Sequence, residues 1–233
     1  MAQPANAEAE TMPATVEING ASLVLDVAGA AFWPDERMLM VADLHLEKGS
    51  SLTRNGHFIP PYDTAATLAR LVQVVARYAP RTIAFLGDAF HDPFAGERID
   101  PADVTTITAM GSGRTLLWIA GNHDPAPPER VPGERLDAQA IGPLELRHIP
   151  QKQAASGEIA GHLHPVARVK TRAKIVRRPC FLSNRTRMIL PAFGAYTGGL
   201  NVLDAAFDGL CPAPNIHVLG ERRVLPIHPA RLV

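Results

Sequence analysis

Carboxylate, imidazole and amide side chains gather in five short segments of this chain. The segments are Asp43-Leu44-His45, Gly87-Asp88 with His91 close behind, Asn122-His123-Asp124, His148, and His162-Leu163-His164. Their oxygen and imidazole nitrogen atoms are the ligand types of hard-to-borderline divalent cations such as Mn²⁺, Fe²⁺ and Zn²⁺. Neither cysteine of the chain lies in these segments, which disfavours a thiolate site. The set therefore predicts a site for divalent metal ions.

The spacing within two of these segments has a geometric reading. In an extended backbone, residues i and i+2 project to the same side, so both members of a D-x-H or H-x-H pair can face one cation. The neighbours Asn122 and His123 point differently, so one can bind a metal while the other faces a substrate. A single H-x-H is usually an ordinary surface or core pair. The recurrence of such groups at predicted strand ends and turns favours a common site.

Three apolar runs are expected to position these residues. Residues 38–42, 82–86 and 115–120 each have the composition of a buried strand and end in polar residues. Ligands in α/β sheets sit beyond the carboxyl ends of the strands, so the three endings point to one crevice. Between the runs, Asp63 or Thr64 can cap a helix with apolar residues at 68, 71, 72 and 75. A second helix is expected after Pro101.

The remaining pattern predicts one domain with a tail. Asn19-Gly20 between two short β patterns indicates a hairpin turn. Residues 1–15 are rich in Ala, Glu and Pro, and we expect a disordered N-terminal tail there. Short strand patterns and many turn residues fill the second half. Residues 16–233 are expected to form a single domain around a mixed sheet.

Composition excludes several classes of protein. With 46% apolar residues in 233, the chain can bury a sizeable core without help from disulfides. Lys plus Arg and Asp plus Glu each total 23, which excludes a uniformly basic nucleic-acid coat. No apolar run approaches the length of a membrane span. Two cysteines are typical of reduced thiols, and a cytoplasmic location is expected. The sequence predicts no oligomeric state.

In order along the chain, the five segments resemble the five-motif signature of the calcineurin-like metallophosphoesterases. The resemblance implies a mixed α/β fold, a four-layer α/β/β/α sandwich of two mixed β-sheets, with two metal ions at the strand ends. It implies Mn²⁺ above all, with Fe or Zn as options. The implied ligands of the first ion are Asp43, His45, Asp88 and His164. Those of the second are Asp88, Asn122, His148 and His162, so that Asp88 bridges the ions.

Three further segments sharpen the resemblance. Residues 42–49, 59–64 and 190–201 resemble the ligase-associated DNA damage response endonucleases. That subfamily implies a DNA substrate, a role in DNA repair, and a functional link to a DNA ligase, a helicase and a nuclease-like hydrolase. Protein Ser/Thr phosphatases of the superfamily carry G-D-x-x-D-R-G at the second motif. This chain has His91 in place of that aspartate, which disfavours a protein phosphatase.

Elementary chemistry supports phosphodiester hydrolysis at such a site. Two divalent ions with two carboxylate ligands retain positive charge, which attracts phosphate and brings the pKa of a bound water to about 7. The resulting hydroxide would attack the phosphodiester. Protonation of the leaving oxygen contributes roughly 10²–10⁴-fold, and His123 is the candidate acid. Asp124 could orient His123 or raise its pKa. His91 would either contact the phosphate or hydrogen-bond a neighbouring site residue.

One segment carries a local excess of positive charge. Residues 166–187 hold eight Lys and Arg and no acid, which leaves 15 basic and 23 acidic residues elsewhere. Within it, alternate residues are basic: Arg168, Lys170, Arg172 and Lys174. As a strand this segment would show one cationic face, which is typical of phosphate-backbone binding. The alternative is a solvated edge strand protected from aggregation by its charges.

The sequence leaves two rival functions beside a DNA endonuclease. A small-molecule phosphoesterase, acting on nucleotides or cyclic nucleotides, would use the same site, and the basic segment would then be incidental. A non-catalytic scaffold would have lost ligands or the acid histidine, whereas this chain keeps all seven ligand positions and His123. Residues 193–200, with three glycines, are expected to pack as a strand and turn and not to contact substrate.

Overall fold

The computed structural model describes residues 11–57, 59–153 and 156–233. Residues 1–10 of the expected tail lie outside this range. The rest of that segment is already part of the sheet structure, because strand β1 begins at Ala14 and Met12 forms a parallel bridge with Arg223.

The first sheet contains the strands predicted around the metal-site segments. In spatial order its strands are β1 (Ala14–Ile18), β2 (Ala21–Leu25), β3 (Ala31–Trp33), β4 (Met38–Val41), β5 (Thr82–Leu86), β6 (Thr115–Ile119) and β7 (Glu134–Leu136). The predicted hairpin turn is present, with positive φ at both Asn19 (50°) and Gly20 (87°). Strands β1 to β4 pair antiparallel, and β4 to β7 pair parallel. The parallel part brings three strand ends to one edge.

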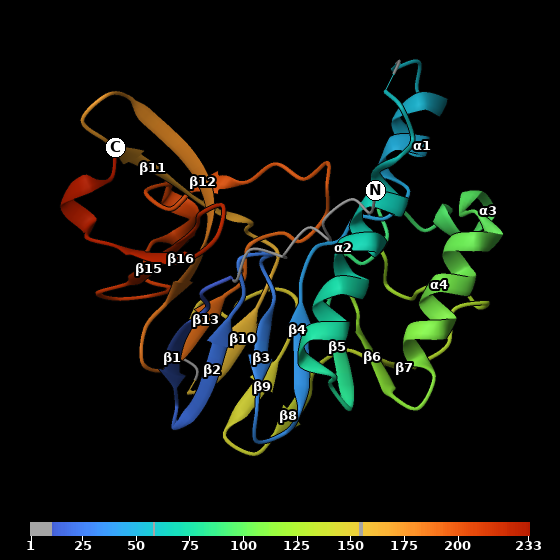
Figure 1. The fold of residues 1–233 in the computed structure, drawn as a ribbon, viewed down its shortest axis with the longest axis horizontal. Coiled ribbons are helices and arrows are strands. Elements are labelled where there is room, and N and C mark those ends of the chain that lie inside the picture. Colours follow the sequence, from blue (N-terminus) through green and yellow to red (C-terminus); the bar gives the residue numbers. More distant parts are fainter. Residues whose placement is uncertain (1–10, 58, 154–155) are drawn as a thin grey trace, which may run out of the picture.

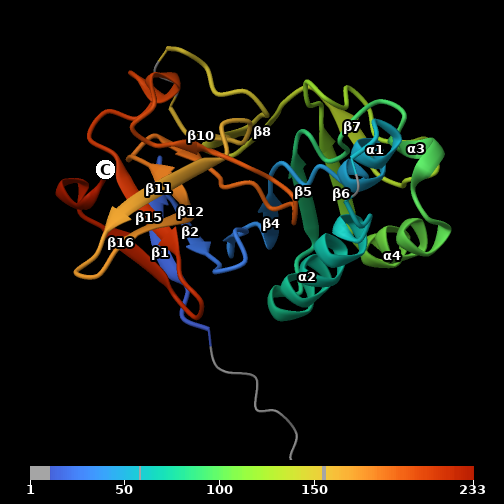
Figure 2. The same cartoon turned by 90° about the horizontal axis from the view of Figure 1, so that it is seen from above.

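The long helices α2 (Asp63–Tyr78) and α4 (Pro101–Gly111) cover one face of this sheet (Figures 1 and 2). The short helix α3 (Ala95–Arg98) precedes α4, and α1 (Lys48–Arg54) projects beyond the ends of the strands (Figure 1). Helix α4 begins after Pro101 as predicted, with the Asp100 side chain accepting from the Ala102 amide. Helix α2 buries Leu68, Leu71 and Val75 as predicted, but Val72 is 40% exposed and Val74 is buried instead. The apolar stripe is rotated toward Val74, a difference that helical spacing alone does not resolve.

The second sheet is mixed and comes from the second half of the chain. Its strands are β8 (Gln139–Ile141), β9 (Leu144–Leu146), β10 (Glu158–Ala160), β11 (Pro165–Lys170), β12 (Ile175–Ser183), β13 (Arg187–Ile189), β14 (Leu200–Asn201), β15 (Asn215–Leu219) and β16 (Val224–Ile227). Strand β10 pairs parallel with β9 and β13, while β11 and β12 form an antiparallel hairpin. The 3₁₀ helices η1 (Ala205–Phe207) and η2 (Pro229–Arg231) complete this half.

The two sheets pack face to face over a shared apolar core. Met38 and Met40 of β4 contribute to it from one side, and Phe181 and Met188 from the other. Because both sheets bury side chains there, we propose that residues 16–233 form a single domain. The predicted mixed α/β fold with two mixed sheets is confirmed. A further apolar cluster, which includes Phe207 of η1, packs against strands of the second sheet, and the described chain after α4 has 3₁₀ helices but no α-helix.

Both tryptophans and both cysteines of the chain are buried. Trp33 and Trp118 are in the core, and the Trp118 ring stacks on Phe85 at a centroid distance of 3.8 Å. Cys180 and Cys211 are both free and buried. Among the described residues, we find no helix with the length and apolarity needed to cross a bilayer.

Candidate metal centre

The candidate metal ligands converge where both sheets meet at one edge. Asp43, Asp88 and Asn122 follow the carboxyl ends of β4, β5 and β6. From the second sheet, His148 follows β9, and the segment between β10 and β11 carries His162 and His164. A parallel bridge between Ala42 and the chain just after β13 ties the two sheets together at this edge. The crevice predicted from the strand endings is therefore present, and the second sheet supplies its other wall.

The backbone at this edge adopts an unusual conformation. Positive φ angles occur at five of the candidate ligands, against ten such non-glycine residues in the described chain. They are Asp43 (54°), His45 (45°), Asp88 (46°), His162 (72°) and His164 (45°). Left-handed backbone is costly for such residues and clusters at functional sites. The D-x-H and H-x-H pairs thus converge through left-handed turns, and the extended geometry expected from their spacing is wrong.

The first donor set consists of Asp43, His45 and His164, whose candidate ligand atoms all lie within 4.8 Å of one another. The Nε2 atoms of His45 and His164 are 3.4 Å apart. His164 Nε2 also lies 3.2 Å from Asp43 Oδ1. Two imidazole nitrogens and a carboxylate oxygen are thus directed at one point, an arrangement suited to a cation.

The second donor set consists of Asp88, His148 and His162, again within 4.8 Å of one another. His148 Nε2 lies 3.3 Å from Asp88 Oδ2 and 3.0 Å from Asn122 Oδ1. The other ring nitrogen of His148 donates to the Leu86 carbonyl over 2.9 Å, which leaves the Nε2 lone pair for a ligand. Asp88 Oδ2 is also 3.9 Å from His45 Nε2. Asp88 therefore lies between the two sets, in the position of a bridge.

Electrostatics favours the ligand-competent form of most of these groups. Burial lowers the pKa of His45 to about 3, and the neighbouring His164 adds to the effect. Burial and His148 lower the pKa of His162. Burial opposes ionisation of Asp88, but the hydrogen bond and charge of His148 outweigh it and bring the pKa of that carboxyl to about 2. His148 is the exception: burial lowers its pKa, but the hydrogen bond to Asp88 and the charge of Asp43 outweigh burial and raise it, so metal binding there must displace a proton. In the other groups, unprotonated imidazoles and an ionised carboxylate are the forms that bind metal, so the donor sets fit divalent cations.

Two glycines make this close packing possible. Gly87 has φ of 76°, and a Cβ atom there would collide with the His148 ring. A Cβ at Gly121 would collide with the carboxylates of Asp88 and Asp124. Any larger residue at either position would push the donor groups apart.

The chain is similar to solved structures of a nuclease and a phosphoesterase. No protein-family model matches the chain, and neither does any curated protein. Among solved structures, a nuclease of Pseudomonas putida, MPE, is 30% identical, with a TM-score of 0.72 over 92% of this chain and 100% of that chain. YfcE, a phosphoesterase from E. coli, is 13% identical, with a TM-score of 0.40 over 82% of this chain and 97% of that chain.

This chain belongs to the metallophosphoesterase superfamily. The match to MPE, at 30% identity over 92% of this chain and 100% of that chain, decides this point. The metallophosphoesterase is accordingly a hydrolase acting on ester bonds, and its His and Asp groups could hold metal ions.

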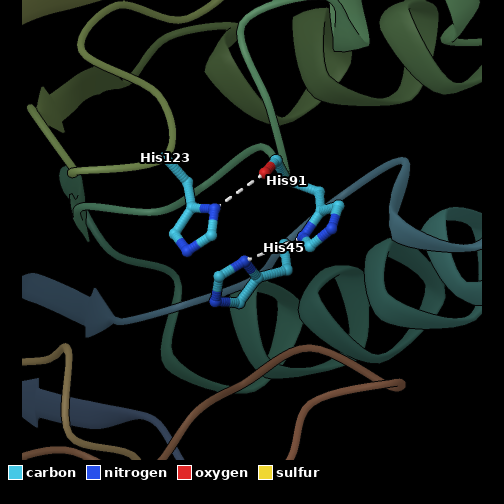
Figure 3. Close-up of side chains that lie close together, drawn as sticks. All are labelled: His45, His91 and His123. Carbon is cyan, nitrogen blue, oxygen red and sulfur yellow. Dashed lines mark hydrogen bonds between the residues drawn. The ribbon is translucent and has the colours of Figure 1, made fainter. Parts of the chain in front are cut away.

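Beside the donor sets, the metallophosphoesterase has a cavity of about 300 Å³. His91 and His123 line it together with His45. Figure 3 shows these three rings side by side: His45 Nδ1 lies 3.4 Å from His91 Nδ1, and the His91 and His123 rings are stacked 5.5 Å apart. Burial lowers the pKa of His91, with Lys48 adding to the effect. His91 thus both touches His45 and faces the cavity, so each role considered for it is geometrically open.

The backbone of His91, and not Asp124, orients His123. His123 Nδ1 lies 3.1 Å from the His91 carbonyl oxygen, which can only accept, so Nδ1 carries the proton and Nε2 is the free nitrogen. Asp124 is buried, and its Oδ2 accepts from the Phe90 amide over 2.8 Å. Burial raises the pKa of Asp124 to about 7. The segment from Gly121 to Asp124 forms a tight turn, in which the Gly121 amide donates to the Asp124 carbonyl over 3.2 Å. Asp124 at the end of this turn bonds to Phe90 through its side chain.

Some cavity residues were missed by sequence reasoning. Lys48, the first residue of α1, is half-buried and lines the cavity. It follows Glu47, which has a left-handed backbone (φ 68°) and a buried carboxylate that accepts from Thr64 and Ser50. The only sequence signal was its place beside the first motif. Residues 198–200 also line the cavity, so the expectation that residues 193–200 only pack is wrong for them, although Phe193 is fully buried.

The basic segment has a different geometry from the one expected. Strand β11 follows His164 directly but ends at Lys170, so Arg172 and Lys174 do not extend its cationic face. The reason is Thr171, whose hydroxyl bonds to both the amide and the carbonyl of Lys174 and closes a tight turn. The predicted row of four is therefore two residues, Arg168 and Lys170.

Arg177 of β12 joins that row from the opposite strand. It lies directly across from Arg168 in the ladder, and such pairs share a face of a sheet. Its guanidinium donates to the Gly199 carbonyl over 2.8 Å, and Gly199 lines the metal cavity. The cationic face of the hairpin therefore adjoins the cavity.

Proposed function

We propose that this metallophosphoesterase is a binuclear-metal-dependent phosphodiesterase that cleaves DNA, of the ligase-associated DNA damage response endonuclease type (PdeM). The observation that carries the proposal is the pair of donor sets with Asp88 between them, opening onto a cavity beside the cationic face of the β11–β12 hairpin. The full-length likeness to a protein named as a nuclease supports it. The proposal includes a repair role in the cytoplasm alongside a DNA ligase, a helicase and a nuclease-like hydrolase.

In this proposal the ligands are divided as the motif order implies. One ion would be held by Asp43, His45, Asp88 and His164, and the other by Asp88, Asn122, His148 and His162. Mn²⁺ suits this mixture of oxygen and imidazole ligands, as do Fe and Zn. Two such ions, when bound, supply charge neutralisation of the phosphate and a nucleophile at neutral pH.

The chain's own residues do the remaining work. With Nδ1–H bonded to the His91 carbonyl, His123 in its doubly protonated form carries a second proton on Nε2 and transfers that proton to the leaving oxygen. The His91 backbone thereby fixes the direction of that transfer. His91 and Lys48, both at the cavity wall, orient the phosphate. The cations of the hairpin neutralise the neighbouring phosphates of the strand.

The test is hydrolysis by the Mn²⁺-loaded protein of single-stranded DNA, duplex DNA and bis-nitrophenyl phosphate, with metal content measured on the same preparation. Cleavage of DNA and close to two ions per chain are expected. A stoichiometry of one ion, or hydrolysis of the small diester without any cleavage of DNA, would overturn the proposal.

A small-molecule phosphoesterase is the second candidate. The cavity volume of about 300 Å³ lies at the lower end of the range for small-ligand pockets, which favours a compact substrate such as a nucleotide. Faster turnover of a cyclic nucleotide than of DNA would identify this function.

A further inference from the structure

A second groove lies on the far side of the β11–β12 hairpin from the metal cavity. Strand β12 is long: its first half pairs with β11, whereas Cys180–Ser183 pairs with β15. Strand β12 thus joins the β11–β12 hairpin to the β15–β16 hairpin, and the two hairpins diverge from that junction (Figures 1 and 2). Between them is a groove of about 520 Å³, against about 300 Å³ for the metal cavity.

This groove has an apolar floor and a basic rim. Val169, Val176 and Leu225 are among its apolar lining residues. Its cationic lining residues are Arg178, Arg222, Arg223 and Arg231. Glu221 is the one acid among the lining residues, so the groove has a net charge of +3 in a chain with a net charge of zero. The groove thus concentrates positive charge on a concave surface.

The backbone of the rim is held in place while its guanidinium groups are free. The Met12 amide donates to the Arg222 carbonyl over 2.8 Å, and the Gly220 amide donates to the Arg223 carbonyl over 3.0 Å. Strand β11 is tied to the C-terminus by the bond from the Val233 amide to the Arg168 carbonyl (3.0 Å). Within the described chain, the four guanidinium groups form no hydrogen bond or ion pair, and all four residues are exposed. Such cations are available to a polyanion without breaking existing contacts.

The groove and the cations that adjoin the metal cavity lie on opposite faces of one hairpin, and the groove reaches the turn of that hairpin at Thr171. Neighbouring residues of a strand project to opposite faces, so Arg177 faces the cavity side of the hairpin and Arg178 faces the groove. The exposed turn at residues 171–174, with two further cations, connects the two faces. Strand β11 spans roughly 20 Å, so a ligand that reaches both places must be long as well as anionic.

We propose that this arginine-lined groove binds the phosphodiester backbone of the DNA strand, several nucleotides away from the bond that is cleaved. The inference rests on the proposed function, and it assigns the contacts that a long substrate makes and a short one does not. Charge complementarity and a place on the same hairpin as the cavity-side cations favour nucleic acid over an acidic peptide.

The test compares two triple variants of the full chain with equal loss of charge. The groove variant is Arg222→Gln, Arg223→Gln and Arg231→Gln. The control variant is Arg81→Gln, Arg135→Gln and Arg185→Gln, three exposed arginines that do not line the groove. Binding of a fluorescent 30-nucleotide single strand is followed by anisotropy in EDTA at several salt concentrations. Bis-nitrophenyl phosphate is too small to reach the groove from the metal centre. Its hydrolysis in the presence of Mn²⁺ therefore reports on the metal centre alone.

The groove variant should bind the oligonucleotide on the order of tenfold more weakly. The slope of log affinity against log salt concentration should become shallower by about 2, because each lost phosphate contact reduces the slope by about 0.7. The control variant should bind like the unmodified protein. Leu225→Glu, which places a carboxylate on the groove floor at a residue already 39% exposed, should weaken binding independently of the arginines.

Equal binding by the groove variant and the unmodified protein, or equal losses in the two triple variants, would overturn the inference. So would competition by poly-glutamate as strong as that by DNA at equal charge, because the groove would then be a site for acidic peptides. Failure of the unmodified protein to hydrolyse any phosphodiester would refute the proposed function alone, because the EDTA binding experiment would still decide the groove.

Discussion

The metal centre and the β11–β12 hairpin are neighbours, yet their polar side chains are held in opposite ways. At the metal centre, Asp43 and Asp88 are buried and lie within 4 Å of imidazole nitrogens, on a left-handed backbone. On the hairpin, the cations are exposed. Among the described residues, the side chain of Arg177 alone of these cations bonds to the rest of the fold, through the Gly199 carbonyl.

The difference follows from what each region must do. Cleavage of a phosphodiester needs donor atoms fixed to within about 0.5 Å, and costly backbone conformations are acceptable for that purpose. Attraction of a polyanion depends on charge and salt, and tolerates mobile side chains. We therefore expect substitutions at the metal centre to abolish function and those on the hairpin to reduce it in proportion to charge.

The largest effect is expected for Asp88→Asn. This change removes the charge between the two donor sets, so metal affinity should fall by more than roughly 100-fold and hydrolysis of every diester should be lost. Elemental analysis after Mn²⁺ reconstitution should fall from two ions per chain to one or none. Retention of two ions would show that Asp88 does not bridge them.

His123→Ala should leave metal content intact. Turnover of DNA, whose leaving oxygen needs a proton, should fall roughly 10²–10⁴-fold. Hydrolysis of bis-nitrophenyl phosphate should fall much less, because nitrophenolate leaves without protonation. Equal losses on the two substrates would argue against an acid role.

Lys48→Gln tests a cation at the wall of the cavity beside the metal centre. Loss of one charged hydrogen bond to phosphate should lower kcat/KM by about tenfold on both large and small diesters. Lys48→Arg should restore most of it, and the metal content of both variants should match that of the unmodified protein. No change in kcat/KM would place Lys48 outside the phosphate site.

The smallest effects are expected on the hairpin, where two pairs of cations can be compared. The double variant Arg168→Gln with Lys170→Gln should make the slope of log DNA affinity against log salt concentration shallower by about 1.4, because each phosphate contact contributes about 0.7. Arg172→Gln with Lys174→Gln, in the turn, should change it by less. Hydrolysis of bis-nitrophenyl phosphate should be unchanged in both. If the turn pair has the larger effect, DNA passes over the tip of the hairpin and not along its cavity-side face.

The sequence predicts the positions of the strands much better than the contacts of the side chains. Strand β5 is apolar from Ile83 to Leu86 and is followed by Gly87, so both its presence and its end are visible locally. The helix at α2 was also predictable, although the rotation that exposes Val72 depends on which neighbours pack against it.

Contacts between distant segments were the main source of error. Asp124 bonds to the amide of Phe90, 34 residues away, and no local pattern indicates this partner. The alternation of cations after Arg168 looks like a longer strand, because the hydroxyl of Thr171 that closes the turn is a single residue in an otherwise β-like pattern. Left-handed angles at Asp43 and His45 are likewise invisible in the spacing of the motif.

The donor groups of the metal centre are divided between the two sheets, with Asp43 and Asp88 on one and His148 and His162 on the other. An ion held between them would act as a cross-link that keeps the halves of the protein in register. Ligand binding stabilises a folded state by about 2.7 kcal/mol at a free concentration 100 times the Kd. Metal supply would then set the thermal stability and protease resistance of this chain as well as its activity, and a chelator would loosen the seam between the sheets.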